Sequence, residues 1–265
     1  MADSLSYKAT TIKDSFLQDK DEQLILEEPL SMRIEGNAYA VVMRTPGDEI
    51  NHAAGFFLSE GLVSHPDDFT TIGYCTEDGV NVVTATLKPQ RRKKVENLLD
   101  RRGFVSQTSC GICGKELIKD IHQIVQPVSQ ALHISYQDLG DCVKRLTDQQ
   151  SLYHSTHGAH AALILDSQLM PLAFAEDVGR HNALDKAIGQ AFMHSQLQQS
   201  RLAVLSSRIS YELVQKAARA RLEMIVALSR PTSLAVDLAA QLKMTLVVRR
   251  RNGLVTVFCG KNRIL

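Results

Sequence analysis

Hydrophobic and polar residues in the second half of the chain follow two alternating patterns: short continuous apolar runs and longer stretches with helical spacing. The apolar runs predict strands over 161–165, 170–175, 202–205, 224–228, 245–249 and 255–259. The stretches with apolar residues three and four positions apart predict helices over 136–148, 182–194, 211–221 and 234–241. Short apolar strands that alternate with helices are typical of a sheet covered on both faces. We therefore expect an α/β architecture from residue 136 onward.

The first half of the chain has shorter periodic stretches and more turn residues. Strand-like runs at 28–34 and 39–44 flank Gly36-Asn37, and a second pair within 73–87 turns at Glu77-Asp78-Gly79, so each pair predicts a β-hairpin. Helices are expected over 49–59 and over the basic segment 91–102. The first twenty residues are polar, and we expect them to form a lead-in or an edge segment.

These patterns divide the chain into two predicted domains. A small α+β domain covers residues 1–125 and ends in a glycine-rich loop, and a larger α/β domain covers residues 126–265. The fold is thus α/β in its C-terminal part and α+β overall. The 265 residues, 44% of them hydrophobic, are sufficient for cores in both domains.

Charge and cysteine content narrow the class of protein. A net charge of +1 predicts no general attraction to nucleic acid or to a membrane surface. No apolar run approaches the ~20 residues that cross a bilayer, and the first residues lack the apolar core of a signal peptide. The five cysteines are odd in number and, one pair apart, widely spread, unlike a secreted disulfide framework. We therefore expect a cytoplasmic protein with reduced thiols.

The paired cysteines are Cys110 and Cys113, each followed by a glycine. A Cys-x-x-Cys can be a redox pair, half of a zinc site or a sulfur-handling site. No second cysteine pair lies nearby to complete a zinc site, and no thioredoxin-like unit surrounds the loop. The glycines let backbone N–H groups approach the sulfurs, and a thiolate stabilised in this way could attack a persulfide and hold its outer sulfur.

Three predicted strand-to-helix junctions carry similar polar residues. Helix N-termini attract phosphate, and arginine and hydroxyl groups add donors to it. Helix capping is the simpler interpretation of any one junction, but three in succession at one edge favour a phosphate-rich, nucleotide-like ligand. The candidate binding residues are Arg180, His181, Ser206, Ser207, Arg208, Ser229, Arg230, Thr232 and Ser233.

Two further segments could join this pocket. His154, His157 and His160 recur at every third position, and we favour a polar loop with His160 reaching into the pocket over a metal site. The basic segment from Arg249 to Leu254 is a hairpin turn that could also grip phosphates. No metal ion is predicted for this chain.

Four sequence blocks resemble signatures of a known family. They are Ser109-Cys110-Gly111-Ile112-Cys113-Gly114, the run from Glu176 to Lys186, the run from Ser206 to Glu212 and the run from Pro231 to Val236. Together they resemble the formate dehydrogenase accessory sulfurtransferases of the FdhD/NarQ family. The resemblance extends from about Glu28 to the C-terminus.

This resemblance implies a sulfur carrier required for formate dehydrogenase activity. Such a protein takes sulfane sulfur from a cysteine desulfurase and passes it to the molybdenum or tungsten bis(pyranopterin guanine dinucleotide) cofactor, with guanine nucleotide (GDP-like) as a binding surrogate. Cys110 would bear the persulfide and Cys113 would be its partner. The cofactor-binding turn would comprise Arg249, Arg250, Arg251, Asn252, Gly253 and Leu254. The resemblance also implies a three-layer, cytidine-deaminase-like C-terminal domain and a homodimer.

Two other functions stay open at this point. The chain could be a non-catalytic chaperone that binds the molybdenum cofactor, or a zinc-binding structural protein. Deamination is disfavoured, because neither His-x-Glu nor Pro-Cys-x-x-Cys occurs in the chain.

Overall fold

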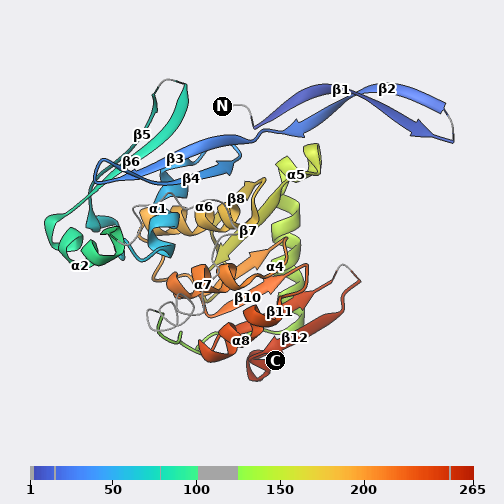
Figure 1. The fold of residues 1–265 in the computed structure, drawn as a ribbon. Helices are drawn as coiled ribbons and strands as arrows, with labels where there is room; N and C mark the ends of the chain where they lie inside the picture. The colour runs from blue at the N-terminus through green and yellow to red at the C-terminus, as the bar shows by residue number, and fades with distance from the viewer. Residues whose placement is uncertain (1–2, 15, 78, 101–124, 251) are drawn as a thin grey trace.

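Three β-sheets organise the part of the chain that the structure describes. The computed structural model describes residues 3–14, 16–77, 79–100, 125–250 and 252–265. Within these ranges there are a two-stranded, a four-stranded and a six-stranded sheet (Figure 1). No helix among the described residues is both long and apolar enough to span a membrane.

The six-stranded sheet has the strand order β12-β11-β10-β9-β7-β8. Its strands are β7 (His160–Leu165), β8 (Pro171–Asp177), β9 (Leu202–Leu205), β10 (Met224–Ala227), β11 (Thr245–Arg249) and β12 (Val255–Cys259). β9, β10 and β11 are parallel, and β7 is antiparallel to both β8 and β9. The carboxyl ends of β8, β9, β10 and β11 therefore lie at the same edge of the sheet. The antiparallel strand β7 begins at that edge.

Helices cover both faces of this sheet. On one face lie α6 (Arg180–Met193), α7 (Tyr211–Arg219) and α8 (Ser233–Gln241), and on the other lies α4 (Tyr136–Gln149). Successive strand residues enter opposite cores: Ile164 packs in the core that contains Leu184 of α6, and Leu163 packs in the core that contains Leu139 of α4. The predicted α/β class is confirmed. The likeness to cytidine deaminase and the boundary at residue 125 stay predictions.

The four-stranded sheet belongs to the first half of the chain. It contains β3 (Glu28–Ile34), β4 (Asn37–Arg44), β5 (Phe69–Glu77) and β6 (Val80–Leu87), in the order β4-β3-β6-β5, and both predicted hairpins are present. Helix α2 (Pro89–Asp100) follows β6. Helix α1 (Glu49–Ser59) packs against α6 and so joins this sheet to the larger one (Figure 1).

The α1–α6 contact depends on two glycines that face the other helix. A Cβ at Gly55 would lie 2.0 Å from the carbonyl oxygen of Asp185, and a Cβ at Gly189 would lie 1.8 Å from that of Asn51. No side chain fits at either position without moving a helix backbone. At these two positions the backbones of α1 and α6 are in direct contact.

The prediction for the first twenty residues was wrong. They form most of a β-hairpin, β1 (Ser4–Lys13) paired with β2 (Phe16–Ile25) along its whole length. The hairpin was missed because its strands are mostly exposed and polar and lack clear alternation of apolar residues. A short helix, α5 (Ser151–Thr156), was also not predicted.

Candidate functional site

The carboxyl ends of β8, β9 and β10 bring the three predicted junctions to one edge of the sheet. His160, the first residue of β7, pairs with Asp177, the last residue of β8. On the other side of β7, the amide of Ala161 donates to Ser206 Oγ at 2.8 Å, and the amide of Ser206 donates to the carbonyl of Ala161 at 3.1 Å. His160 therefore lies between the first and second junctions.

His181 links the first junction to the second. Its Nε2 atom lies 2.8 Å from Glu212 Oε2 and 3.1 Å from Ser210 Oγ. The hydrogen bond with His181 lowers the pKa of Glu212, which keeps this carboxylate ionised. Glu212 was not among the predicted site residues, although it lies in one of the sequence blocks.

Cations gather around His160. Burial, and then the charge of Arg180, lowers the pKa of His160, and His181 and Arg208 act in the same direction. An imidazole with a lowered pKa stays neutral at physiological pH. The buried Nε of Arg180 has no hydrogen-bond partner among the described residues. This edge can therefore donate to an anion without giving up an internal bond.

Backbone hydrogen bonds join the second and third junctions. The amide of Thr232 donates to the carbonyl of Ile209 at 3.0 Å, and the amide of Ile209 donates to the carbonyl of Arg230 at 3.4 Å. Arg208 and Arg230 are exposed, as are Thr232 and Ser233. Both arginines are thus held on a fixed loop pair and can reach solvent.

Several of the predicted hydroxyls make local structural contacts. Thr232 Oγ1 accepts from the amide of Ala235 and caps α8, and the Ser207 hydroxyl donates to the carbonyl of Arg208. Ser206 Oγ accepts from Ala161, as described above. Thr232 thus fits the simpler capping interpretation, whereas the two serines hold the loop and the adjacent strand β7. Ser229 lies in the third junction, half-buried.

The turn between β11 and β12 lies beside α4. Gly253 has a φ of 86°, a left-handed conformation that glycine adopts without strain, and its carbonyl accepts from Tyr136 Oη at 2.8 Å. The carbonyl of Arg250 accepts a hydrogen bond from the amide of Gly253, and the amide of Arg250 donates to the carbonyl of Leu254. Asn252 Oδ1 accepts from the amide of Leu254. Arg251 lies outside the described residues.

Arg249, which ends β11, lies against α4 where Gly140 leaves room for it. A Cβ at Gly140 would be 2.8 Å from Nη2 of Arg249. The Nε of Arg249 is buried and has no hydrogen-bond partner within the described ranges. A groove of about 820 Å³ lies beside α4. It is lined by Arg249, Gly140, Tyr136 and Tyr153, and by Leu228, which follows β10. Sequence reasoning missed this groove, although a glycine inside a predicted helix is a signal that could have indicated it.

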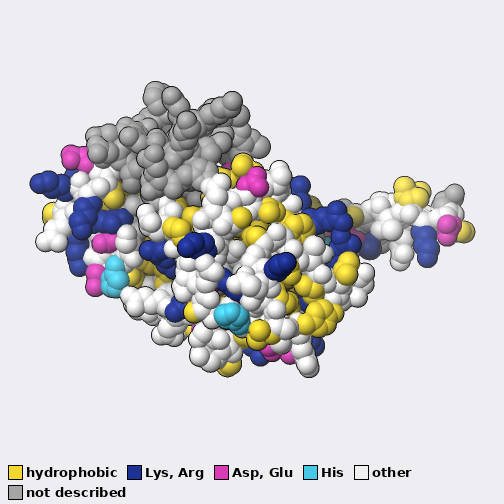
Figure 2. All heavy atoms as spheres, turned by 90° about the horizontal axis from the view of Figure 1, so that it is seen from below, with side chains coloured by type: hydrophobic (Ala, Val, Ile, Leu, Met, Phe, Trp, Pro, Cys, Tyr) yellow, Lys and Arg dark blue, Asp and Glu magenta, His cyan; other side chains and the backbone are white. Residues whose placement is uncertain are grey.

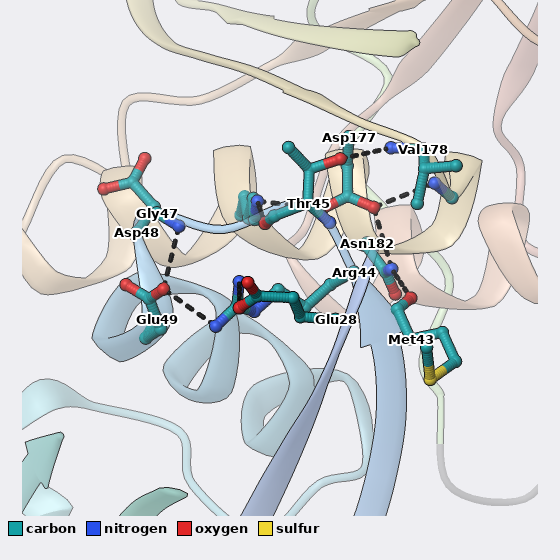
Figure 3. Close-up of polar contacts among 12 residues, drawn as sticks. Glu28, Met43, Arg44, Thr45, Gly47, Asp48, Glu49, Asp177, Val178 and Asn182 are labelled. Carbon is teal, nitrogen blue, oxygen red and sulfur yellow. Dashed lines mark hydrogen bonds and ion pairs between the residues drawn. The ribbon is translucent and has the colours of Figure 1, made fainter. Parts of the chain in front are cut away.

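A buried polar network supports the first junction (Figure 3). Asp177 Oδ1 accepts from the amide of Gly179 at 2.8 Å and from Asn182 Nδ2 at 2.9 Å. Asp177 Oδ2 accepts from the amide of Thr45 at 3.1 Å and forms an ion pair with Lys186 Nζ at 2.8 Å. Thr45 follows β4, so the network ties the start of α6 to the four-stranded sheet.

The histidine triplet is dispersed. His154 Nε2 lies 3.1 Å from the carbonyl of Thr147, His157 ends α5 with a φ of 53°, and His160 begins β7. Within the described ranges, no group of three His, Cys, Asp or Glu side chains is arranged to hold a metal ion.

Comparison with known proteins identifies the family of the chain. The model of the FdhD/NarQ family matches residues 25–265. The chain belongs to the FdhD/NarQ family. A sulfur carrier protein FdhD from Streptomyces coelicolor is 36% identical over 97% of this chain and 94% of its own length. One from Anaeromyxobacter dehalogenans is 32% identical over 92% of this chain and 88% of its own length.

A solved structure shares the fold. It is that of a candidate formate dehydrogenase accessory protein from Desulfotalea psychrophila, with a TM-score of 0.78 and 21% identity. The match covers 99% of both chains. The described residues therefore have a fold that has already been observed in a crystal structure.

Within this FdhD/NarQ chain, Cys110 and Cys113 lie outside the described residues. The three cysteines that are described have different environments. Burial raises the pKa of Cys142 to about 11, and burial also raises that of Cys259, whereas Cys75 is exposed on β5. Cys142 of α4 packs in the core, which confirms its predicted core position. Thiols with raised pKa values are poor nucleophiles at neutral pH.

Proposed function

We propose that this chain is a sulfur carrier that is required for formate dehydrogenase activity. The observation that carries the proposal is the family match over nearly the whole chain, with relatives named sulfur carrier proteins. The motif Cys110-Gly111-Ile112-Cys113-Gly114 supplies the nucleophile that such a function needs. In the sequence, the motif lies near the boundary between the two predicted domains.

In the proposed reaction, a cysteine desulfurase presents a persulfide and the Cys110 thiolate attacks its outer sulfur. A new S–S bond forms at Cys110, the S–S bond of the donor breaks, and the donor cysteine leaves as a thiolate. Cys110 then carries the sulfane sulfur to the cofactor, with Cys113 as its partner. The burial of Cys142 and Cys259 supports this choice, because neither thiol is suited to attack a second protein.

The proposed acceptor is the molybdenum or tungsten bis(pyranopterin guanine dinucleotide) cofactor, bound as a transfer substrate. Its phosphates suit the cationic edge formed by Arg180, Arg208 and Arg230. Guanidinium groups bind phosphate through paired, charge-assisted hydrogen bonds. The unpartnered Nε atoms of Arg180 and Arg249 support this fit, since a bound anion would give them the acceptor that the described residues do not provide.

The groove beside α4 extends the proposed binding surface. It adjoins the turn from Arg249 to Leu254 and offers Tyr136 and Tyr153 for contact with a planar ring. The partners that we propose are a cysteine desulfurase, the catalytic subunit of formate dehydrogenase and a second copy of the chain. Reduced thiols fit a cytoplasmic location.

Maturation of formate dehydrogenase in cells tests the proposed function. In cells that lack this chain, the wild-type chain and its Cys75→Ser variant should restore formate dehydrogenase activity, and Cys110→Ser should not. Cys75 is an exposed thiol and serves as the matched control. Full activity with Cys110→Ser would favour the non-catalytic chaperone instead.

Calorimetry with guanosine diphosphate tests the binding surface separately. A hydrogen bond to a charged group contributes about 1.5–3 kcal/mol. Arg208→Ala, Arg230→Ala or Arg249→Ala should therefore each weaken binding by about ten- to a hundredfold while leaving sulfur loading intact. Arg221, an exposed residue just after α7 at the opposite edge of the sheet, is the control and should not matter. Unchanged affinity in all three variants would reject the phosphate assignment.

A further inference from the structure

A second pocket lies at the edge of the six-stranded sheet where β9 and β10 begin, opposite the cationic edge. Its volume is about 540 Å³, which is within the range of pockets that bind ligands. The carboxyl ends of α1, α6 and α7 surround it, and they contribute Leu58, Phe192 and Ala218 to its lining. The cofactor-binding surface proposed above does not include this second pocket.

One side of the second pocket is apolar. Leu58, Val63 and Phe192 line it from the core that α1 shares with α6. Leu197, which is partly buried against the same core, continues this wall. An apolar group that covers the wall removes apolar surface from water on both partners, which is favourable.

Two arginines form the other side of the second pocket. The Nε atom of Arg219 is buried and has no hydrogen-bond partner among the described residues. Its guanidinium group lies against Gly61, where a Cβ would be 3.1 Å from Nη2. Arg221 is exposed, and its Nη1 atom donates to the carbonyl of Pro127 at 3.5 Å, a distance at which a hydrogen bond is weak. Both arginines therefore have N–H groups available for a ligand.

The surroundings of Arg219 are mainly cationic. Burial lowers the pKa of Arg219, and the charges of Arg91 and Arg221 act in the same direction. The carboxylate of Glu60 opposes this shift. Lys and Arg side chains also lie next to hydrophobic ones on the face of the molecule seen from below (Figure 2). The second pocket therefore favours a ligand that carries an anionic group beside an apolar group.

A carboxylate suits this position better than a phosphate. The three helix ends that surround the second pocket carry partial negative charge, which opposes a multiply charged anion. A single carboxylate can instead form paired, charge-assisted hydrogen bonds with one guanidinium group. An acidic side chain next to an apolar side chain in one peptide segment would fill both sides of the pocket.

The second pocket also lies close to the segment that carries the paired cysteines. Val125 and Gln126, the first described residues after that segment, line the pocket. Helix α2 leads into the segment, and its residue Arg91 donates to the carbonyl of Leu62 at 2.8 Å, next to the lining residue Val63. A protein bound in the pocket is therefore beside the chain that leads to the thiols.

We propose that the second pocket binds a peptide segment of the sulfur-donor protein in which an acidic residue adjoins an apolar one. The inference rests on the proposed function and adds the place and the chemistry of the donor's contact. The donor protein then binds at the edge of the sheet opposite the cationic edge, so it does not compete with the phosphates of the cofactor. A small-molecule sulfur donor has no such segment and does not need the pocket.

The first test compares two sulfur donors. The full chain is loaded either by a cysteine desulfurase with free cysteine or by glutathione persulfide, and the sulfur on Cys110 is followed by mass spectrometry. In Arg221→Glu, the desulfurase concentration for half-maximal loading should rise at least about tenfold, because attraction of a carboxylate becomes repulsion. Loading by glutathione persulfide should keep its wild-type rate.

Lys243→Glu is the matched control for this test. Lys243 and Arg221 are both exposed cations two residues after the end of a helix, with φ values of 57° and 61°. Lys243 is not among the described residues that line the second pocket, so its variant should load normally from both donors.

Two results would overturn the proposal. One is an unchanged desulfurase dependence in Arg221→Glu, and the other is an equal loss with both donors, which would place the effect at the thiol. A wild-type chain that gains no sulfur from either donor would reject the proposed function itself, and this inference with it.

The second test fills the pocket and measures binding without sulfur transfer. Gln198 and Gln199 are neighbouring exposed residues, and of the two only Gln198 lines the second pocket. In a chain that also carries Cys110→Ser, Gln198→Trp should weaken the binding of the desulfurase at least about tenfold, as measured by biolayer interferometry, and Gln199→Trp should not. Equal affinities of the two tryptophan variants would contradict the proposal, because the pocket would then not be the contact.

Discussion

Lys186 forms a buried ion pair with Asp177 that supports the first junction. Its side chain is 3% exposed and that of Asp177 is fully buried, and Nζ also donates to the carbonyl of Thr45 at 2.7 Å. Both charges are removed from water, so each depends on the other. This pair holds the start of α6, and with it Arg180 and His181, against the strand that ends at Arg44.

Replacement of Lys186 should therefore be costly. Lys186→Met leaves the Asp177 carboxylate buried without its cation and should lower the free energy of unfolding by about 3–5 kcal/mol. Urea denaturation measures the change. Lys144→Met removes an exposed ion pair with Asp148 and should leave the urea midpoint unchanged. A similarly small effect at Lys186 would show that the buried pair does not stabilise the junction.

His52 makes stability depend on pH. Burial, and then the charge of Lys186, lowers its pKa well below the ordinary value of 6.5. Below that value the unfolded chain binds a proton that the folded chain excludes, so stability is lost as the pH falls, by up to about 1.4 kcal/mol per pH unit. His52→Gln should flatten the decline between pH ~6.5 and ~5 in urea denaturation. An unchanged slope in the variant would mean that His52 takes up its proton in the folded chain.

At the residue scale, sequence reasoning could place the junction residues but not their partners. Arg180, Arg208 and Arg230 share one edge because strands that run parallel end together, which follows from element order. The contact of His181 with Glu212, and that of Arg249 with Gly140, depend on how a helix rotates against its neighbours. Periodicity in a single sequence does not define that rotation, so these partners were missed.

At the element scale, α4 is the helix that shapes the groove. Alanine favours a helix by about 1 kcal/mol over glycine, so Gly140 in its interior lowers the stability of the helix itself. The absence of a side chain there allows Arg249 to lie along the helix surface. Gly140 therefore lowers the stability of α4 but leaves room for the guanidinium group of Arg249.

Gly140→Ala tests this role. The added methyl group should displace the Arg249 guanidinium, so the affinity for guanosine diphosphate should fall about tenfold although the helix gains an alanine. Gly73→Ala is the control, because a Cβ there meets nothing within 4 Å, and calorimetry should show unchanged affinity. If Gly140→Ala binds as tightly as the wild type, Arg249 does not contact the nucleotide from this position.

Strongly periodic elements were predicted well, and weakly periodic ones were not. β9, β11 and β12 have the predicted limits, and so does α1, because each has a continuous apolar run or clear turn residues at its ends. The β1–β2 hairpin lacks that pattern because neither of its faces packs on a core. α5 is only six residues long, too short for its periodicity to be recognised.

At the scale of the whole molecule, Gly55 and Gly189 decide how the two halves of the chain meet. The helices α1 and α6 lie far apart in the sequence, and no sequence pattern predicted that they would pack against each other. Gly189→Ala should force the helices apart and lower the free energy of unfolding by about 1–3 kcal/mol. Thermal or urea denaturation measures this change. Gly36→Ala is not a suitable control, because Gly36 has a φ of 78°, which strains an alanine. Gly73→Ala has neither a close neighbour nor a positive φ and should be neutral.

The central claim is that Cys110 carries sulfur, and peptide mapping after sulfur loading tests it most directly. The purified full chain is incubated with a cysteine desulfurase and free cysteine, and the persulfides are then blocked and located by mass spectrometry. We predict one added sulfur atom on Cys110, retained in Cys75→Ala and lost in Cys110→Ala. No added sulfur on Cys110, or equal loading of Cys75, would contradict the proposed carrier function.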